Sequence, residues 1–154
     1  MTDTTRDSGR GSTWGLARTV AAVFGVVYVL VGILGFLPGL VSGDAPSGMP
    51  SAEGNLLGIF PVNAVHNIVH LVIGAALLYG ATGRDAAVGV LKVVGAVYIL
   101  VGILGIVSPD GFGLLPLGGA DIFLHLASGA IFLAAAFMDS GDRRDTRDRD
   151  ARAA

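Results

Sequence analysis

The chain of 154 residues is strongly apolar, since 53% of its residues are hydrophobic and only 14% are charged, with a mean hydropathy of +0.71. A soluble domain of this length needs more polar surface than that, so we expect lipid to form part of the solvent. The formal net charge of -2 gives no indication of a nucleic-acid partner, and the lack of cysteine in the sequence excludes disulfides, thiolate metal sites and thiol catalysis.

Four apolar segments follow one another along the chain. Each predicts a membrane-spanning helix, because as a helix it is about as long as the ~30 Å hydrocarbon core of a bilayer is thick. The predicted helices cover residues 16–37, 62–81, 86–107 and 120–138. Residues 1–15 are small and polar and predict a disordered tail, and residues 139–154 alternate in charge and predict a solvated tail. The sequence therefore predicts one all-α transmembrane domain over residues 16–138.

Two loops join the predicted helices at the same end of the bundle. In the first loop, residues 38–61, the stretch GNLLGIF at 54–60 is apolar enough to lie at the membrane interface. Pro61 suits the first turn of the second helix, where its missing N–H costs nothing. The second loop covers residues 108–119. We expect both loops to lie outside the hydrocarbon core.

The basic residues lie at the opposite end of the predicted bundle. All ten Lys and Arg residues fall in the two tails, in the joint between the second and third helices, or in the adjoining helix ends at Arg18 and Lys92. The two loops contain only the acidic residues Asp44, Glu53 and Asp110. The positive-inside rule then predicts a multi-pass protein of the cell membrane with both termini in the cytoplasm. A cleaved signal sequence is disfavoured, because the first apolar run is longer than a typical h-region.

The two halves of the predicted domain repeat one another. Residues 27–35 (VYVLVGILG) recur as residues 97–105 (VYILVGILG), and residues 70–78 recur more loosely as residues 125–133. The first helix thus corresponds to the third and the second to the fourth, which predicts a bundle of two parallel helical-hairpin repeats. Glycines seven residues apart in the first and third helices indicate tight contact near the pseudo-symmetry axis that relates the two halves.

Polar residues form a stripe in the outer half of the second and fourth helices. In the second helix they are spaced i, i+3, i+4 and i+7, and therefore share one face. Ionisable side chains in membrane helices normally face the bundle interior and are functional candidates. Two tyrosines lie at a similar depth in the other helices, so we expect each to form a hydrogen bond with a histidine. The predicted polar cluster consists of Asn63, His66, Asn67, His70, Asp121, His125, Tyr28 and Tyr98.

Three interpretations of this cluster are open. The first is an interhelical hydrogen-bond network that fixes the helix packing. The second is a metal or haem site, with His66, His70, Asp121 and His125 as the candidate ligands. The third is a proton or ion path, although Lys92 is the only buried charge predicted in the inner half. The sequence positions no nucleophile beside Asp121 and His125, so enzymatic chemistry is not favoured.

The segment LLGIFPVNAVHNIVHLVIGAALLYG at residues 56–80, with the later VYILVGILG and DIFLHLASGAIFL, resembles the domain-of-unknown-function 4383 family of bacterial four-helix membrane proteins. The resemblance covers about residues 16–138, and its most specific part runs from Phe60 to His70. It implies a bacterial membrane protein of the predicted topology, and it implies no activity, substrate or cofactor.

The expected function is therefore that of a non-enzymatic multi-pass membrane protein with a structural or partner-binding role. A metal- or haem-binding membrane protein is the main alternative, and a proton or ion path is the weaker one. The expected partners are the lipid bilayer and either a second copy of the chain or another membrane protein, but no nucleic acid. The residues identify no cofactor.

Overall fold

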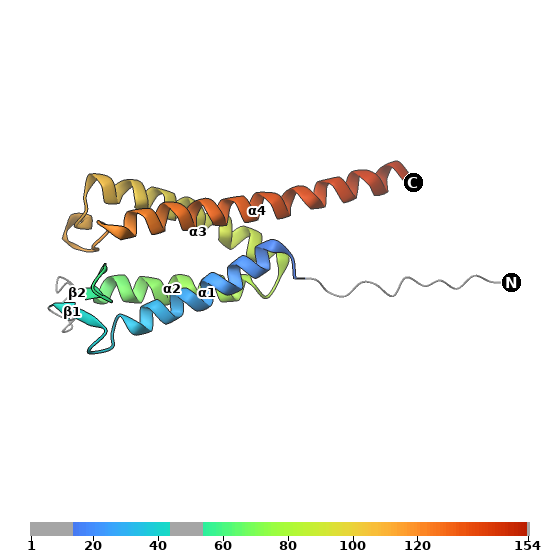
Figure 1. Cartoon of the computed structure of the whole chain (residues 1–154). Coiled ribbons are helices and arrows are strands. Elements are labelled where there is room, and N and C mark those ends of the chain that lie inside the picture. The colour runs from blue at the N-terminus through green and yellow to red at the C-terminus, as the bar shows by residue number, and fades with distance from the viewer. Residues whose placement is uncertain (1–13, 44–53, 154) are drawn as a thin grey trace.

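The computed structural model describes residues 14–43 and 54–153, with side chains up to Asp139. This part of the chain is mostly helical, with four α-helices: α1 (Leu16–Leu34), α2 (Ala64–Gly80), α3 (Arg84–Val107) and α4 (Ala120–Ala153) (Figure 1). By length and composition, α1, α3 and the Ala120–Asp139 part of α4 can each cross a membrane. α2 is also apolar but shorter, with 17 residues. The predicted all-α class and its four helices are confirmed.

The first two helices are shorter than predicted, for local reasons. α1 ends at Leu34 instead of residue 37, because the N–H groups of Phe36 and Leu37 bond to carbonyls three residues back and tighten the chain. α2 begins at Ala64 instead of residue 62. Pro61, which we expected in its first turn, lies in a strand instead.

The last two helices are longer than predicted. α3 begins at Arg84, two residues before the expected start at residue 86. α4 begins at residue 120 as expected but continues as helix through the predicted tail to Ala153. The tail predicted for residues 1–15 lies, up to residue 13, outside the described residues.

After the predicted orientation, we call the end of the bundle where α1 ends and α2 begins the outer end, and the opposite end the inner end. The first outer loop contains a small sheet that the sequence analysis did not predict. Strands β1 (Val41–Gly43), β2 (Gly54–Leu56) and β3 (Phe60–Val62) are antiparallel and lie in the order β1-β2-β3. Their buried residues pack together against Val31 and Leu34 of α1. The sheet therefore covers the outer end of α1, where we had expected the apolar stretch to lie at the membrane interface.

Each helical hairpin is held together by a close approach of two helix backbones. A Cβ atom added to Gly74 of α2 would lie 3.0 Å from the carbonyl oxygen of Gly25 in α1. A Cβ atom added to Gly129 of α4 would lie 2.9 Å from the carbonyl oxygen of Gly95 in α3. Only glycine allows this approach, and the two pairs occupy corresponding positions of the repeated sequence. The glycine spacing in α1 and α3 predicted tight contact near the pseudo-symmetry axis, but these glycines contact α2 and α4 within their own hairpins instead.

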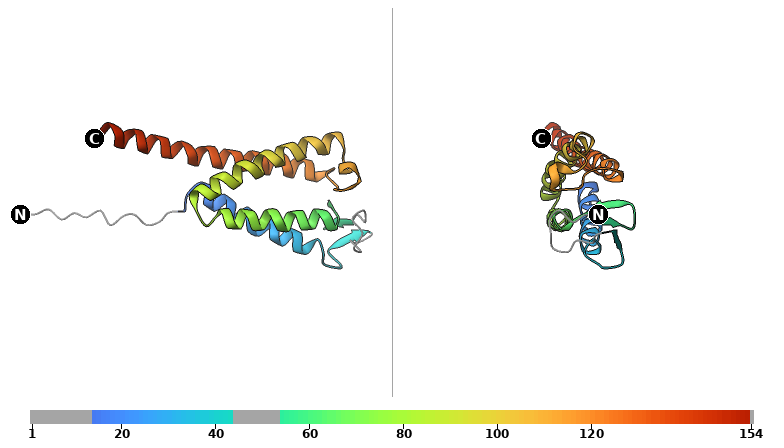
Figure 2. Two further views of the ribbon diagram at one scale, coloured as in Figure 1. Left: turned by 180° about the vertical axis from the view of Figure 1, so that it is seen from behind. Right: turned by 90° about the vertical axis from the view of Figure 1, so that its left-hand side faces the viewer.

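The α1–α2 and α3–α4 hairpins approach one another at the end where α2 joins α3, and they separate toward the end with the sheet (Figure 2). Near the joined end, the buried core is built largely of small side chains, which allow the hairpins to approach. These are Ala17, Ala21, Ala81, Ala87, Ala135 and Ala136. The separation at the other end leaves room for larger side chains between the hairpins.

A buried carboxylate joins the two hairpins at this end. Asp139 of α4 accepts a hydrogen bond of 3.0 Å from the backbone N–H of Ala17, in the first turn of α1. Arg84, the first residue of α3, donates to the Asp139 carboxylate and, from Nη2, to its backbone carbonyl. Arg18 donates to the carbonyl of Ala81 at the end of α2, at 2.9 Å. The Asp139 carboxylate thus lies near the N-terminal ends of α1 and α3, and Arg18 at the C-terminal end of α2, which are the helix ends that their charges favour. Asp139, which we expected in a solvated tail, is a structural residue of the bundle.

The glycine contact generates a stability prediction. Gly74→Ala would place its Cβ 2.8 Å from the backbone nitrogen of Val29, and a backbone cannot shift as a side chain can. We expect the overpacking, about 1–3 kcal/mol, to exceed the gain in helix propensity of about 1 kcal/mol. The midpoint of thermal unfolding in detergent, followed by circular dichroism, should therefore fall.

Gly89→Ala is the matched control, because Gly89 is an exposed helical glycine of α3 with nothing within 4 Å of its added Cβ. This variant should be as stable as the unsubstituted protein or more stable. Equal midpoints for the two variants would show that the α1–α2 crossing tolerates a side chain.

Candidate functional site

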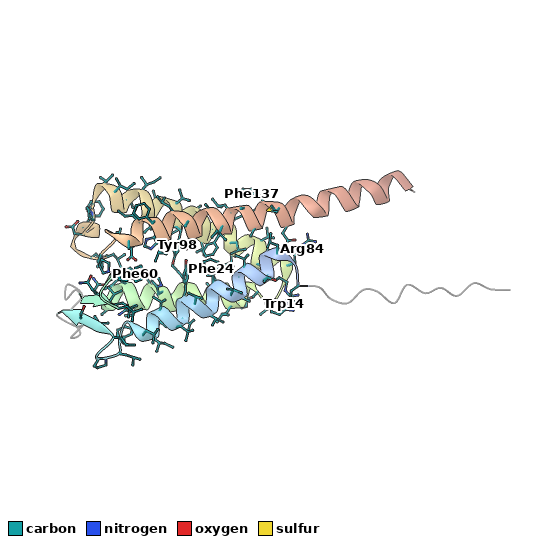
Figure 3. All side chains as sticks on the ribbon, viewed as in Figure 1. Trp14, Phe24, Phe60, Arg84, Tyr98 and Phe137 are labelled. Atoms are coloured by element: carbon teal, nitrogen blue, oxygen red, sulfur yellow. The ribbon has the colours of Figure 1, made fainter. Side chains whose placement is uncertain are left out.

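The predicted polar cluster lies between the hairpins in their outer half. Its aromatic and histidine rings form one connected group: the ring centroids are 5.2 Å apart for Tyr28 and His70, 5.0 Å for Tyr98 and His125, and 5.6 Å for the stacked Tyr28 and Tyr98. His66 stacks on His70 at 4.7 Å. Tyr98 extends into the space between the hairpins, facing Phe24 of the other hairpin (Figure 3). Helices of both hairpins therefore contribute to a single site.

The two asparagines of the cluster have structural partners. Asn63 accepts a hydrogen bond from the backbone N–H of His66 at 2.8 Å and so caps the start of α2. Its Nδ2 donates to the carbonyl of Leu114 in the second outer loop, at 3.0 Å. Asn67 donates from Nδ2 to the carbonyl of Gly35 at 2.8 Å, where a Cβ on Gly35 would overlap the amide. These residues tie the outer ends of the helices and loops together.

His66 links the cluster to the second outer loop. Its Nδ1 lies 3.2 Å from the carbonyl oxygen of Pro116, and because a carbonyl only accepts, Nδ1 is the donor. The other ring nitrogen, Nε2, lies 3.8 Å from Oδ2 of Asp121, which is longer than a hydrogen bond. His66 is therefore oriented by the loop and faces the Asp121 carboxyl group.

Four polar side chains of the cluster have a buried atom without a hydrogen-bond partner. These atoms are Oδ1 of Asn67, Nδ1 of His70, Oδ2 of Asp121 and Nδ1 of His125. Asp121 is only 5% exposed and His125 only 7%. Buried polar atoms in proteins normally find a partner. Asn67 still donates through its other amide atom, whereas the side chains of His70, Asp121 and His125 face a cavity. A hydrogen-bond network within the protein therefore explains some of these polar groups, but it does not explain the buried atoms that have no partner.

The tyrosines pack against the histidines without the hydrogen bonds that we expected. The hydrogen-bonding neighbours of the Tyr28 hydroxyl are the side chains of Ser128 and Tyr98. Within residues 14–43 and 54–139, no hydrogen bond joins a tyrosine hydroxyl to a histidine ring. The rings meet through their faces and edges instead, which leaves the Nδ1 atoms of His70 and His125 unpartnered.

An aromatic layer closes the site toward the inner half of the bundle. Phe24 lies edge-on against Phe132 at 4.8 Å, and Phe132 also contacts Tyr28 and Tyr98. Phe132 is fully buried. The sequence analysis missed Phe24 and Phe132, although Phe24 lies one helical turn from Tyr28 and Phe132 two turns from His125. Between this layer and Asp139 at the inner end, the buried side chains that the structure describes are apolar, so a proton or ion path would have no polar side chains to follow over that stretch.

A cavity of about 230 Å³ borders the polar cluster between α1 and α4. The unpartnered side chains of His70, Asp121 and His125 all line it, and its other walls are largely apolar. A second cavity of about 70 Å³ lies between α2 and α3 on the other side of the cluster. His66, His70, Tyr98 and His125 line both cavities and so separate them.

The grouping and orientation of the histidines bear on the metal interpretation of the cluster. In the part of the chain that the structure describes, no three or more His, Cys, Asp or Glu side chains are grouped so that they could hold a metal ion. His66 and His70 are stacked face to face, at an interplanar angle of 21°. Stacking directs the edges of the two rings past one another, whereas ligands of one metal ion must point their nitrogens at a common centre.

These features define the class of protein. Long apolar helices, with a polar cluster enclosed between two hairpins, make the chain a helical-bundle membrane protein. The chain belongs to the DUF4383 family, whose sequence model, described as a domain of unknown function, matches residues 18–138. No curated protein and no solved structure matches the chain. The family resemblance noted in the sequence is therefore confirmed.

The asparagine cap gives a prediction for the site. Asn63→Ala removes both the cap of α2 and the bond to Leu114, so we expect the free energy of unfolding to fall by about 1–2 kcal/mol. Amide hydrogen exchange should also become faster in the second outer loop. Asn55→Ala is the control, since Asn55 is exposed on β2. The structural role of Asn63 would be contradicted if both variants unfolded at the same denaturant concentration.

Proposed function

We propose that the protein is a non-enzymatic, multi-pass protein of the bacterial cell membrane that crosses the bilayer four times and has both termini in the cytoplasm. The distribution of charge supports this orientation, because all ten Lys and Arg residues lie at or near one end of the bundle. α2 is the shortest crossing, at about 26 Å for its 17 residues. The strand Phe60–Val62, which directly precedes it, extends the segment outward.

The orientation is testable because the chain contains no cysteine, so that a single introduced cysteine reports on one site. Leu114 lies exposed in the second outer loop, and Thr82 lies exposed in the joint between α2 and α3. In intact cells, a membrane-impermeant maleimide should label Leu114→Cys and leave Thr82→Cys unlabelled until the membrane is opened. Labelling of Thr82→Cys alone in intact cells would reverse the proposed orientation.

The proposed role is to bind another membrane protein through the outer end of the bundle. The observation that carries this proposal is the exposure of large apolar side chains on the outer loops: Leu57 is 62% exposed, Ile59 60% and Phe112 79%. Two of them, Leu57 and Phe112, have positive φ angles of 54° and 61°. This conformation costs a residue with a side chain about 1–2 kcal/mol. Bulky apolar residues at strained, exposed positions indicate a contact surface that only a partner completes.

We take a second copy of the chain as the first candidate for this partner. In native membranes, Phe112→Cys should be joined by a short bis-maleimide into a product of twice the chain mass. Thr82→Cys, treated in the same way, is the control for random collision and should remain monomeric. Phe112→Ser, introduced into a Leu57→Cys background, should reduce cross-linking at residue 57.

If Phe112→Cys stays monomeric under these conditions, the partner is not a second copy in contact at this loop. If neither Phe112→Cys nor Leu57→Cys yields any larger product in native membranes, the proposed outer contact surface is wrong.

A further inference from the structure

The cavity between α1 and α4 opens toward the position that lipid occupies around a membrane bundle. Val27 of α1 and Leu124 of α4 both line the cavity, yet they are 45% and 49% exposed, so they form its rim on the outer surface of the helices. Both are aliphatic, as are most exposed residues on the membrane helices. A ligand dissolved in the bilayer can therefore enter sideways between these two helices.

The inner wall of the cavity offers hydrogen bonds without a partner. Nδ1 of His70, Nδ1 of His125 and Oδ2 of Asp121 are buried and unpaired, and these three residues come from both hairpins. An imidazole nitrogen donates or accepts according to its tautomer, and a carboxyl group accepts or, when protonated, donates. A ligand that satisfies these atoms must therefore carry polar groups close together, held within an otherwise apolar pocket.

Charge and shape restrict the class of ligand. Among the residues that the structure describes, no Lys or Arg lines the cavity, whereas Asp121 does, so a phosphate or carboxylate head group would lack a counter-charge. Four aromatic side chains, Phe24, Tyr28, Phe60 and Tyr98, line it and provide faces and edges for a planar ring. A volume of about 230 Å³ is smaller than the ~300–1,000 Å³ pockets that enclose whole drug-sized ligands. It suits a ring-sized head group whose hydrophobic tail stays in the lipid.

We propose that this cavity binds the ring of a membrane-dissolved quinone or quinol. The ring oxygens meet His70, His125 and Asp121, and the alkyl tail leaves between Val27 and Leu124. Quinone carbonyls accept from imidazole N–H groups, and quinol hydroxyls donate to an imidazole nitrogen or to a carboxylate, so the same three side chains serve both forms. The inference assumes the proposed membrane embedding, but it does not depend on the outer contact surface.

The test is direct binding to the full-length protein in detergent micelles, measured by isothermal titration calorimetry. The probe is a benzoquinone that carries a decyl chain, and decylbenzene is the matched compound without the ring oxygens. We expect saturable binding of the quinone and none of decylbenzene beyond its partition into micelles. His125→Leu should weaken quinone binding about tenfold, the effect of one lost buried hydrogen bond and its stranded partner.

A pair of tryptophan variants separates loss of the site from loss of the fold. Leu124→Trp narrows the rim of the cavity and should abolish quinone binding, whereas Phe123→Trp, at an adjacent lipid-facing residue that is 75% exposed, should leave it unchanged. Both positions are exposed, so both variants should fold. The measurement uses detergent-solubilised protein, so failure of the orientation or cross-linking experiments would not affect its outcome.

Three results would overturn the proposal. The first is the absence of saturable quinone binding, which would mean that the cavity holds water or lipid tails only. The second is equal binding of decylbenzene, which would mean that the polar atoms are not used. The third is displacement of bound quinone by tetraphenylphosphonium at lower concentration than by the quinone itself, which would assign the site to lipophilic cations held by Asp121.

Discussion

The close contact of two helix backbones within each hairpin is the constraint on which the rest of the structure depends. Between α1 and α2, and between α3 and α4, glycines let the backbones approach to a distance that no side chain would allow. In a bilayer, where lipid tails are as apolar as the side chains that they replace, such packing is a principal source of helix association. Because each hairpin is packed this tightly within itself, the larger side chains gather between the hairpins.

The contacts that join the two hairpins differ between the two ends of the bundle. At the inner end, small alanine side chains bring the hairpins together, and Asp139 connects the starts of α1 and α3 to the body of α4. At the outer end, aromatic rings and histidines fill the wider space, and the asparagines of α2 hold the loops. Both carboxylate oxygens of Asp139 have hydrogen-bond partners within the protein, whereas the outer cluster leaves polar atoms that face a cavity. This difference is what separates a structural polar group from a candidate binding group here.

Several features were predictable because they depend on local sequence alone. The helices follow from apolar runs of membrane length, and their starts and ends were predicted to within about three residues, except where α4 continues past residue 138. The polar face of α2 follows from helical periodicity, which brings Asn63, His66, Asn67 and His70 to one side of the helix whatever the helix packs against. The three-stranded sheet was missed because its strands have three residues each, too few to show an alternating pattern.

The amino-acid sequence by itself thus determined the helical class, the membrane-length apolar segments, the paired glycines and the set of polar residues in the outer half. Only the tertiary structure decided which polar atoms find partners: Asn63 and Asn67 each donate to a distant backbone carbonyl. Oδ1 of Asn67, Nδ1 of His70, Oδ2 of Asp121 and Nδ1 of His125 are buried without a hydrogen-bond partner. The tertiary structure also places Asp139, which was predicted in a solvated tail, between the two hairpins, and it brings Phe24 and Phe132 into contact beneath the cluster. The physical reason is that periodicity assigns a residue to a face of its own helix, whereas a hydrogen bond or a cavity depends on how far apart two helices lie.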